Sequence, residues 1–217
     1  MAILLREKQV TELLDMETAI AAVEEVLRDQ AEGQATNRPR YRVATPASQL
    51  HLMAAGDNRL GVYGFKAYTA SRKGARFLVM LYESNSGDLL AMIEADRLGQ
   101  MRTGAASGVA TKCMARKDAR TVGIFGTGWQ AESQLMAVCA VREIKSIKAY
   151  GRNAERRNEF AQRMTSLLGV EVSAVDKPED AVAGCSIIIT ATTALRVYNL
   201  ARERGVGENI ELWPGDQ

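Results

Sequence analysis

The sequence predicts an α/β protein in which an N-terminal α+β part is followed by a doubly wound parallel sheet. Two observations predict this class. Short β-type segments follow one another between residues 40 and 95, after a helical segment, as in an antiparallel or mixed sheet. After Asp118 the pattern changes, and apolar strand-like segments alternate with helical ones, which is typical of a parallel sheet with crossover helices.

Each element of the N-terminal part has its own signal. A helix is expected at residues 15–32, behind the capping residue Asp15, because its apolar residues fall on one face. These residues are Ile20, Val23, Val26 and Leu27. Strands are expected at 40–45, 48–55, 61–69, 75–83 and 89–95, and a hairpin-type turn at 84–88 joins the last two. Residues 96–118 concentrate glycine and alanine near their middle, so we expect a closely packed helix that links the two parts.

The C-terminal part is predicted to form four strands with helices between them. The strands are expected at 121–126, 146–151, 170–175 and 185–192, and the helices at about 129–142, 153–168 and 178–184. The last strand, CSIIITAT, is strongly apolar. Its edge would be exposed unless the residues that follow it, or another subunit, cover it.

Composition excludes several classes of partner. The 217 residues are 47% hydrophobic, and 28 Lys and Arg against 26 Asp and Glu give a net charge of +2. Such a balance predicts no nucleic-acid or membrane partner, and favours a small molecule. No apolar run approaches the ~20 residues that cross a bilayer. Charged residues occur within the first ten residues, too early for the apolar segment of a secretory signal. A cytoplasmic location is therefore expected.

No metal site is expected. Cys113, Cys139 and Cys185 are far apart and lie in apolar segments, so we interpret them as buried thiols rather than as a disulfide or a metal set. His51 is the only histidine, and no Cys or His stands near it at ligand spacing. We expect it in the core or in an interface.

A glycine-rich turn predicts a dinucleotide site. Gly126-Thr127-Gly128-Trp129-Gln130-Ala131 follows an apolar strand and opens a helix, which is the context that gives this motif its value. Gly126 allows the tight turn, Gly128 lets the backbone approach a pyrophosphate, and Ala131 keeps helix and strand close. The phosphates would lie at the helix N-terminus. The alternative is a turn that serves only the topology.

The end of the second parallel strand favours NADP(H) over NAD(H). An NAD enzyme usually places an acidic residue there for the ribose hydroxyls, whereas this chain has Gly151-Arg152-Asn153. A guanidinium suits a 2′-phosphate because it offers planar, bidentate donors. Alternatively, Arg152 stacks on the adenine or is simply solvated. Arg156 and Arg157 could assist, or could belong to the solvated side of a helix.

The segment RLGQMRTGAASGVATK at 97–112, with VGIFGTGWQAESQL close behind it, resembles the signature of the ornithine cyclodeaminase/mu-crystallin family. The resemblance runs from about residue 1 to Thr193 and includes Arg38-Pro39-Arg40 and Gly64-Phe65-Lys66. It implies a substrate-binding and dimerisation domain at 1–117, a Rossmann-type NAD(P)-binding domain at 118–193 that is incomplete, and an atypical tail at 194–217. It also implies a homodimer.

The resemblance further implies hydride transfer at the carbon that bears nitrogen in a small amino or imino acid. Alternatives within the family are ornithine cyclodeaminase, ketimine or pyrroline-2-carboxylate reductase, and alanine dehydrogenase. Lys66, Arg40 and Arg102 match the positions that hold the substrate carboxylate and line the reacting centre. Desolvation among apolar neighbours would lower the pKa of Lys66 and suit proton transfer. The residues expected to hold the dinucleotide are Arg102, Thr103, Gly126, Thr127, Gly128, Trp129, Gln130, Arg152, Asn153 and Thr192; Thr103 could instead cap a turn.

Past Thr193 the sequence departs from the family pattern. Family members continue with further parallel strands and a catalytic aspartate, whereas this chain continues with ALRVYNLARERGVGENIELWPGDQ. Three hypotheses therefore stand side by side: an NAD(P)-dependent enzyme, a crystallin-like protein that binds a dinucleotide or ligand without turnover, and an inactive truncated fragment.

Overall fold

The computed structural model describes residues 2–71 and 74–192, so the predicted tail at 194–217 lies outside the described residues. The chain forms two compact units, Met1–Arg102 and Thr103–Gln217. The helix α3 (Asp96–Met114) runs through the boundary between them. We describe each unit separately.

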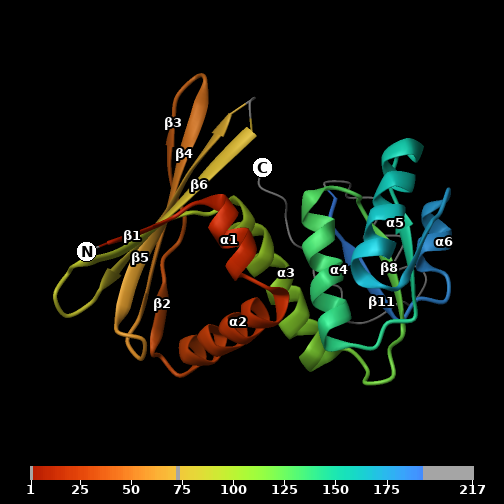
Figure 1. The fold of residues 1–217 in the computed structure, drawn as a ribbon, viewed down its shortest axis with the longest axis horizontal. Helices are drawn as coiled ribbons and strands as arrows, with labels where there is room; N and C mark the ends of the chain where they lie inside the picture. Colours follow the sequence, from red (N-terminus) through yellow and green to blue (C-terminus); the bar gives the residue numbers. More distant parts are fainter. Residues whose placement is uncertain (1, 72–73, 193–217) are drawn as a thin grey trace. The chain divides into compact units, whose positions relative to one another are not determined.

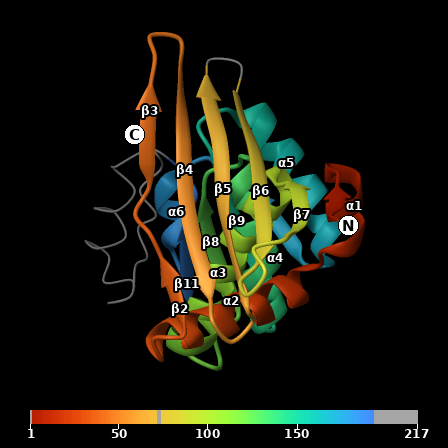
Figure 2. The same cartoon turned by 90° about the vertical axis from the view of Figure 1, so that its left-hand side faces the viewer.

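The first unit is built on a seven-stranded mixed sheet with the order β1-β7-β6-β5-β4-β2, in which β3 also pairs with β4. Only β1 and β7 run parallel to each other; the other described pairs are antiparallel. Figure 1 shows α1 and α2 beside this sheet, and Figure 2 shows the long strands β4, β5 and β6 side by side. Its elements are β1 (Ile3–Leu5), α1 (Glu7–Leu13), α2 (Met16–Ala31), β2 (Ala35–Asn37), β3 (Tyr41–Ala44), β4 (Ser48–Asp57), β5 (Val62–Ser71), β6 (Gly74–Glu83) and β7 (Leu89–Glu94).

Most predicted elements of this unit are confirmed. The five predicted strands correspond to β3 through β7, and Asp15 caps α2 by accepting a hydrogen bond from the Thr18 N–H at 2.7 Å. The elements β1, β2 and α1 were not predicted, because they are three, three and seven residues long, too short to show a period. The prediction was also wrong about one face of α2, because Val26 and Leu27 are 41% and 46% exposed. Instead, the C-terminal half of α2 buries Asp29, which Arg59 Nη2 contacts at 2.6 Å.

Two glutamates cap helix N-termini here: Glu7 caps the start of α3, and Glu94, at the end of β7, caps the start of α1. The Glu7 carboxylate, in the first turn of α1, accepts from the N–H groups of Asp96 and Arg97 at 2.6 and 3.0 Å. Glu94, just before α3, accepts from the Glu7 N–H at 3.0 Å and from Arg6. The Arg6 side chain, and then the Glu7 N–H, lower the pKa of Glu94. Carboxylates at helix N-termini satisfy otherwise unpaired donors, so these contacts fix the helix that carries Arg102.

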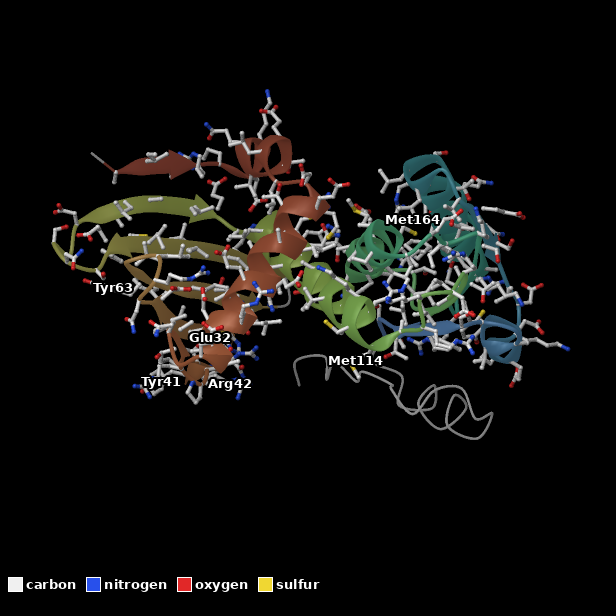
Figure 3. All side chains as sticks on the ribbon, turned by 90° about the horizontal axis from the view of Figure 1, so that it is seen from below. Glu32, Tyr41, Arg42, Tyr63, Met114 and Met164 are labelled. Atoms are coloured by element: carbon white, nitrogen blue, oxygen red, sulfur yellow. The ribbon has the colours of Figure 1, made fainter. Side chains whose placement is uncertain are left out.

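The second unit is a four-stranded parallel sheet of order β10-β9-β8-β11 with helices between successive strands. Its elements are β8 (Thr121–Phe125), α4 (Trp129–Val141), β9 (Ser146–Tyr150), α5 (Ala154–Leu168), β10 (Glu171–Ala174), α6 (Pro178–Val182) and β11 (Ile187–Thr190). The predicted fold class is confirmed. The core lies between the sheet and its helices and includes Val122, Leu135, Ile147, Phe160 and Met164; Figure 3 labels Met164 there.

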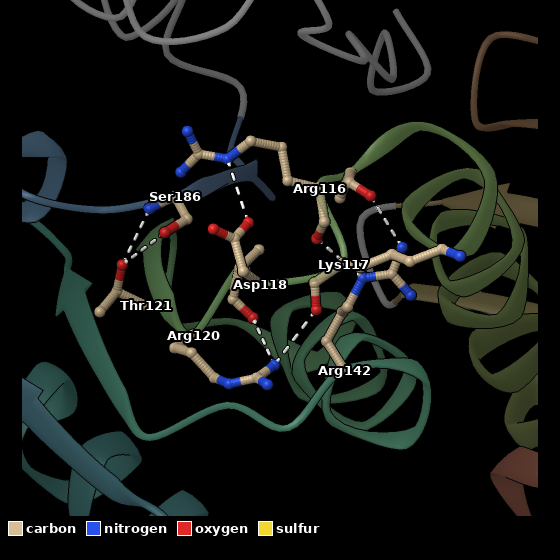
Figure 4. Close-up of polar contacts among 9 residues, drawn as sticks. Arg116, Lys117, Asp118, Arg120, Thr121, Arg142 and Ser186 are labelled. Atoms are coloured by element: carbon tan, nitrogen blue, oxygen red, sulfur yellow. Dashed lines mark hydrogen bonds and ion pairs between the residues drawn. The ribbon is translucent and has the colours of Figure 1, made fainter.

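The link between α3 and the parallel sheet is held by hydrogen bonds to main-chain oxygens (Figure 4). Arg142, at the C-terminus of α4, donates through Nη2 to the carbonyl oxygens of Thr111, Lys112 and Ala115 at 2.8–3.0 Å. One guanidinium therefore caps the C-terminus of α3. The predicted close packing of α3 is confirmed, since a Cβ on Gly104 would lie 2.3 Å from the Ser133 carbonyl oxygen of α4.

The cysteine prediction holds only in part. The described residues contain all three cysteines as free thiols, but Cys113 is exposed in the last turns of α3, so the expectation of burial was wrong there. Cys139 and Cys185 are half-buried, and burial raises the pKa of the Cys139 thiol to about 11. None of the described helices is long and apolar enough to cross a membrane.

Candidate functional site

A column of three aromatic rings crosses the sheet of the first unit. His51 on β4, Tyr68 on β5 and Phe77 on β6 are cross-strand neighbours. The His51 and Tyr68 ring centroids are 4.3 Å apart with planes 3° from parallel, and those of Tyr68 and Phe77 are 4.7 Å apart. His51 and Tyr68 are each 4% exposed, so the prediction of a core position for His51 is confirmed.

Two of the predicted site residues lie beside this column. Lys66 Nζ lies 5.3 Å from the Tyr68 centroid and 5.6 Å from that of Phe77, and Arg40 Cζ lies 5.7 Å from the Tyr68 centroid. Because both faces of Tyr68 are covered by rings, the cations lie beside the stack rather than over a free face. Cation–π attraction therefore contributes little to holding the two cations. The main role of the rings is to form an apolar wall beside them. Two positive groups next to an apolar wall suit a small carboxylate.

The opposite face of the same sheet is apolar and partly open. Tyr63 and Tyr82 stack there at 5.8 Å, and Tyr63 and Tyr41, labelled in Figure 3, are 44% and 66% exposed. A shallow hollow of about 230 Å³ is lined by residues that include Arg38, Gly56 and Tyr63. This face therefore offers apolar surface, separate from Arg40 and Lys66.

The predicted glycine turn joins β8 to α4 in the second unit. Gly126 has a φ of 104°, and a Cβ there would lie 2.2 Å from the Ala191 carbonyl oxygen, so no other residue fits without strain. Gly128 is the N-cap of α4 and provides no side-chain cap, and a Cβ at Gly128 would meet nothing within 4 Å. The first turn of α4, with Trp129 and Gln130 exposed, therefore presents N–H donors beside open space.

The other predicted cofactor residues gather at the same edge of the sheet, because the carboxyl ends of parallel strands lie together. Thr127 packs against Gly151 at the end of β9, where a Cβ would be 2.8 Å from Thr127 Oγ1. Arg152 is exposed, Asn153 caps α5 by accepting from the Arg156 N–H at 2.8 Å, and Thr192 follows β11. β8 is flanked by β9 on one side and β11 on the other, so this edge is a topological switch point, where such sheets bind ligands.

Arg102 and Thr103 belong neither to the strands around the ring column nor to the edge of the parallel sheet. They lie inside α3, at the boundary of the two units. Arg102 is exposed and Thr103 is buried. The idea that Thr103 caps a turn was wrong, because α3 begins at Asp96 and Thr103 lies two turns into it.

This chain is similar in sequence to known proteins. The model of the ornithine cyclodeaminase/mu-crystallin family matches residues 2–203, which extends ten residues beyond the predicted limit at Thr193. The chain belongs to the ornithine cyclodeaminase/mu-crystallin family. Within this family, it is 38% identical over 139 residues to a Delta(1)-pyrroline-2-carboxylate reductase of Bacillus cereus, which covers 64% of this chain and 43% of that protein.

Solved structures of family members have the same fold. Thermococcus litoralis Delta(1)-pyrroline-2-carboxylate reductase in complex with NADH and L-proline matches with a TM-score of 0.83 and 31% identity over 88% of this chain and 62% of its own. An archaeal alanine dehydrogenase dimer with bound NAD matches with a TM-score of 0.83 and 29% identity over 89% of this chain and 61% of its own. This chain thus spans less than two thirds of the length of these family members.

Sequence reasoning missed two features of these sites. The ring column depends on the register of β4, β5 and β6, which no local pattern encodes. Arg157 was expected either to assist Arg152 or to lie on the solvated side of a helix; the second alternative was wrong, because Arg157 is 5% exposed and donates to the Gly151 carbonyl oxygen at 2.7 Å. A basic residue at the helical spacing of Phe160 and Met164 was the available signal.

Proposed function

We propose that this protein binds a nicotinamide dinucleotide at the carboxyl ends of β8, β9 and β11. The turn from β8 to α4 carries this proposal. Its open space at Gly128 and the α4 N-terminus without a side-chain cap fit a pyrophosphate, which needs close backbone approach and N–H donors. Relatives whose structures contain NAD or NADH support it.

We assign the parts of the dinucleotide to residues by their position along the sheet edge. The Gly126–Gln130 segment would hold the pyrophosphate, with Arg102, Thr103 and Thr192 as further contacts, and Arg152 and Asn153 would hold the adenosine end. The exposed Arg152 guanidinium, at a position where an acidic residue would favour NAD, supports NADP(H) as the preferred form.

The proposed reaction is hydride transfer at the carbon that bears nitrogen in a small amino or imino acid. When bound, the dinucleotide supplies or accepts the hydride. Arg40 and Arg102 would clamp the substrate carboxylate, because guanidinium groups bind it bidentately. Lys66 would donate a proton to the substrate nitrogen in the reductive direction and accept it in the oxidative direction.

Within this class we favour reduction of a cyclic imino acid over cyclodeamination. A cyclodeaminase returns the hydride to the same molecule and can keep its cofactor, whereas a reductase must exchange it, which suits a phosphate-bearing reductant. The similarity to pyrroline-2-carboxylate reductases supports this choice. The second candidate function is a binding protein without turnover.

We also propose a homodimer through the apolar sheet face that carries Tyr41 and Tyr63.

The test begins with binding. The purified chain is titrated with NADPH and with NADH, and tryptophan fluorescence and the thermal midpoint are followed. Saturable binding that favours NADPH, and loses that preference in Arg152→Ala, supports the cofactor proposal. Turnover of Δ1-pyrroline-2-carboxylate, lost in Lys66→Met while dinucleotide binding persists, supports the enzyme. A folded protein that binds neither dinucleotide refutes the proposal, and binding without turnover favours the second candidate.

A further inference from the structure

Arg157 joins the loop after β9 to the segment after β10. Its Nη1 donates to the Gly151 carbonyl oxygen at 2.7 Å, and its Nη2 forms an ion pair with Asp176. Gly151 begins the loop that carries Arg152, and Asp176 follows the end of β10. Two nitrogens of one guanidinium thus hold both oxygens, so the Asp176 carboxylate lies next to the loop proposed to hold the adenosine end.

The two charges differ sharply in burial. The Arg157 side chain is 6% exposed, whereas that of Asp176 is 91% exposed. A buried guanidinium needs a compensating partner, and here the partner is a carboxylate that remains at the surface of the sheet edge. That carboxylate is the kind of group that would repel a phosphate, and Arg157 neutralises it.

We propose that Arg157 is a positioning residue that sets the choice between NADPH and NADH. It fixes the start of the loop that carries Arg152, and it cancels the charge of Asp176 beside the place where a 2′-phosphate would lie. The inference rests on the proposed dinucleotide site and extends it: selectivity comes from an exposed arginine that attracts the phosphate and from a buried one that removes a competing negative charge.

The measurement is the ratio of the NADPH and NADH dissociation constants in the full chain. Asp176→Asn is the first variant, because the side chain is 91% exposed and asparagine keeps an oxygen that can accept from Arg157 Nη2. It removes the negative charge and leaves Arg157 uncompensated, so the preference for NADPH should rise about two- to fivefold. Arg157→Met exposes the Asp176 charge, and the preference should fall about five- to tenfold.

The double variant Arg157→Met with Asp176→Asn distinguishes electrostatics from a general loss of structure. If Arg157 acts by cancelling Asp176, the double variant should recover most of the preference lost in Arg157→Met. The inference is overturned if Asp176→Asn leaves the ratio unchanged, or if Arg157→Met weakens both dinucleotides by the same factor. Failure of the native chain to bind either dinucleotide would instead refute the proposed function.

Discussion

Replacing Gly128 with serine should raise stability and weaken dinucleotide binding, two effects of opposite sign at one position. Gly128 is the N-cap of α4, with φ −90° and ψ −175°, a conformation that serine adopts without strain. A serine there can accept a hydrogen bond from an N–H in the first turn, which stabilises a helix by a few tenths of a kcal/mol relative to glycine, up to about 1.

The same substitution fills the space that the proposed pyrophosphate requires. A Cβ at Gly128 meets nothing within 4 Å in the protein, so the added atoms cost nothing until a ligand approaches the backbone. The serine hydroxyl oxygen also accepts from a main-chain N–H of the first turn of α4, which would otherwise donate to the phosphate. We expect dinucleotide affinity to fall at least about tenfold, equivalent to about 1.4 kcal/mol.

Gly126→Ala is the matched control, with the opposite balance. Its φ of 104° would strain an alanine by about 1–3 kcal/mol, and its Cβ would lie 2.2 Å from the Ala191 carbonyl oxygen. We expect about 2–5 kcal/mol of destabilisation, including overpacking. Urea unfolding of both variants compares their stabilities, and dinucleotide titration is carried out on Gly128→Ser. If Gly128→Ser binds NADPH and NADH as the native chain does, the phosphate does not lie at this turn and the reasoning fails.

Three further predictions follow from single contacts. Arg142→Met should lower the free energy of unfolding, measured in urea, by about 2–3 kcal/mol, because the C-terminal carbonyls of α3 lose their donor. Arg120→Met is the control: its contacts are weaker, at 3.3–3.4 Å, and its loss should cost less than about 1 kcal/mol. Equal losses in the two variants would contradict the role of Arg142 as a cap. The N–H of Ser86 is the main cause that lowers the pKa of Glu83 from 4.5 to about 2, so its contribution to stability is present above pH 4.5 and lost as pH falls towards 2. Glu83→Gln should remove that part of the acid dependence of unfolding, and an unchanged pH profile would count against it. Tyr68→Leu should lower kcat/KM for the imino acid about tenfold with dinucleotide affinity unchanged, since it removes the wall beside Lys66 and Arg40, while Tyr68→Phe should stay close to native; an inactive Tyr68→Phe would point to the hydroxyl instead.

The strands and helices could be predicted because their signals are local. The apolar segments of β5, β6, β8 and β11 are properties of a few adjacent residues. The glycine turn was found for the same reason, since Gly126 and Gly128 must follow a strand and open a helix. By contrast, β1 contributes three residues to its sheet, and its parallel pairing with β7 depends on contacts with residues 91–93.

The side-chain partners could not be predicted because they depend on register and on distant chain segments. Tyr68 stacks on His51 and Phe77 only because β4, β5 and β6 pair in one particular register. Val26 and Leu27 looked like core residues by spacing, yet the ion pair between Arg59 and Asp29 takes the inward side of α2 there. The role of Arg157 stayed open between the two alternatives because its partners, Gly151 and Asp176, lie on two other segments.

The parallel sheet of the second unit separates stability from binding along the length of each strand. The strand bodies bury Val122, Ile124 and Ile147 completely, and a loss of volume there would cost several kcal/mol. The strand ends carry Gly128 and Arg152, both exposed, where substitutions change what can bind with little effect on packing. Gly126 is the exception, because it lies at the strand end and packs against Ala191. A variant there cannot distinguish a lost ligand contact from a disturbed sheet, so the binding site has to be tested through Gly128 and Arg152.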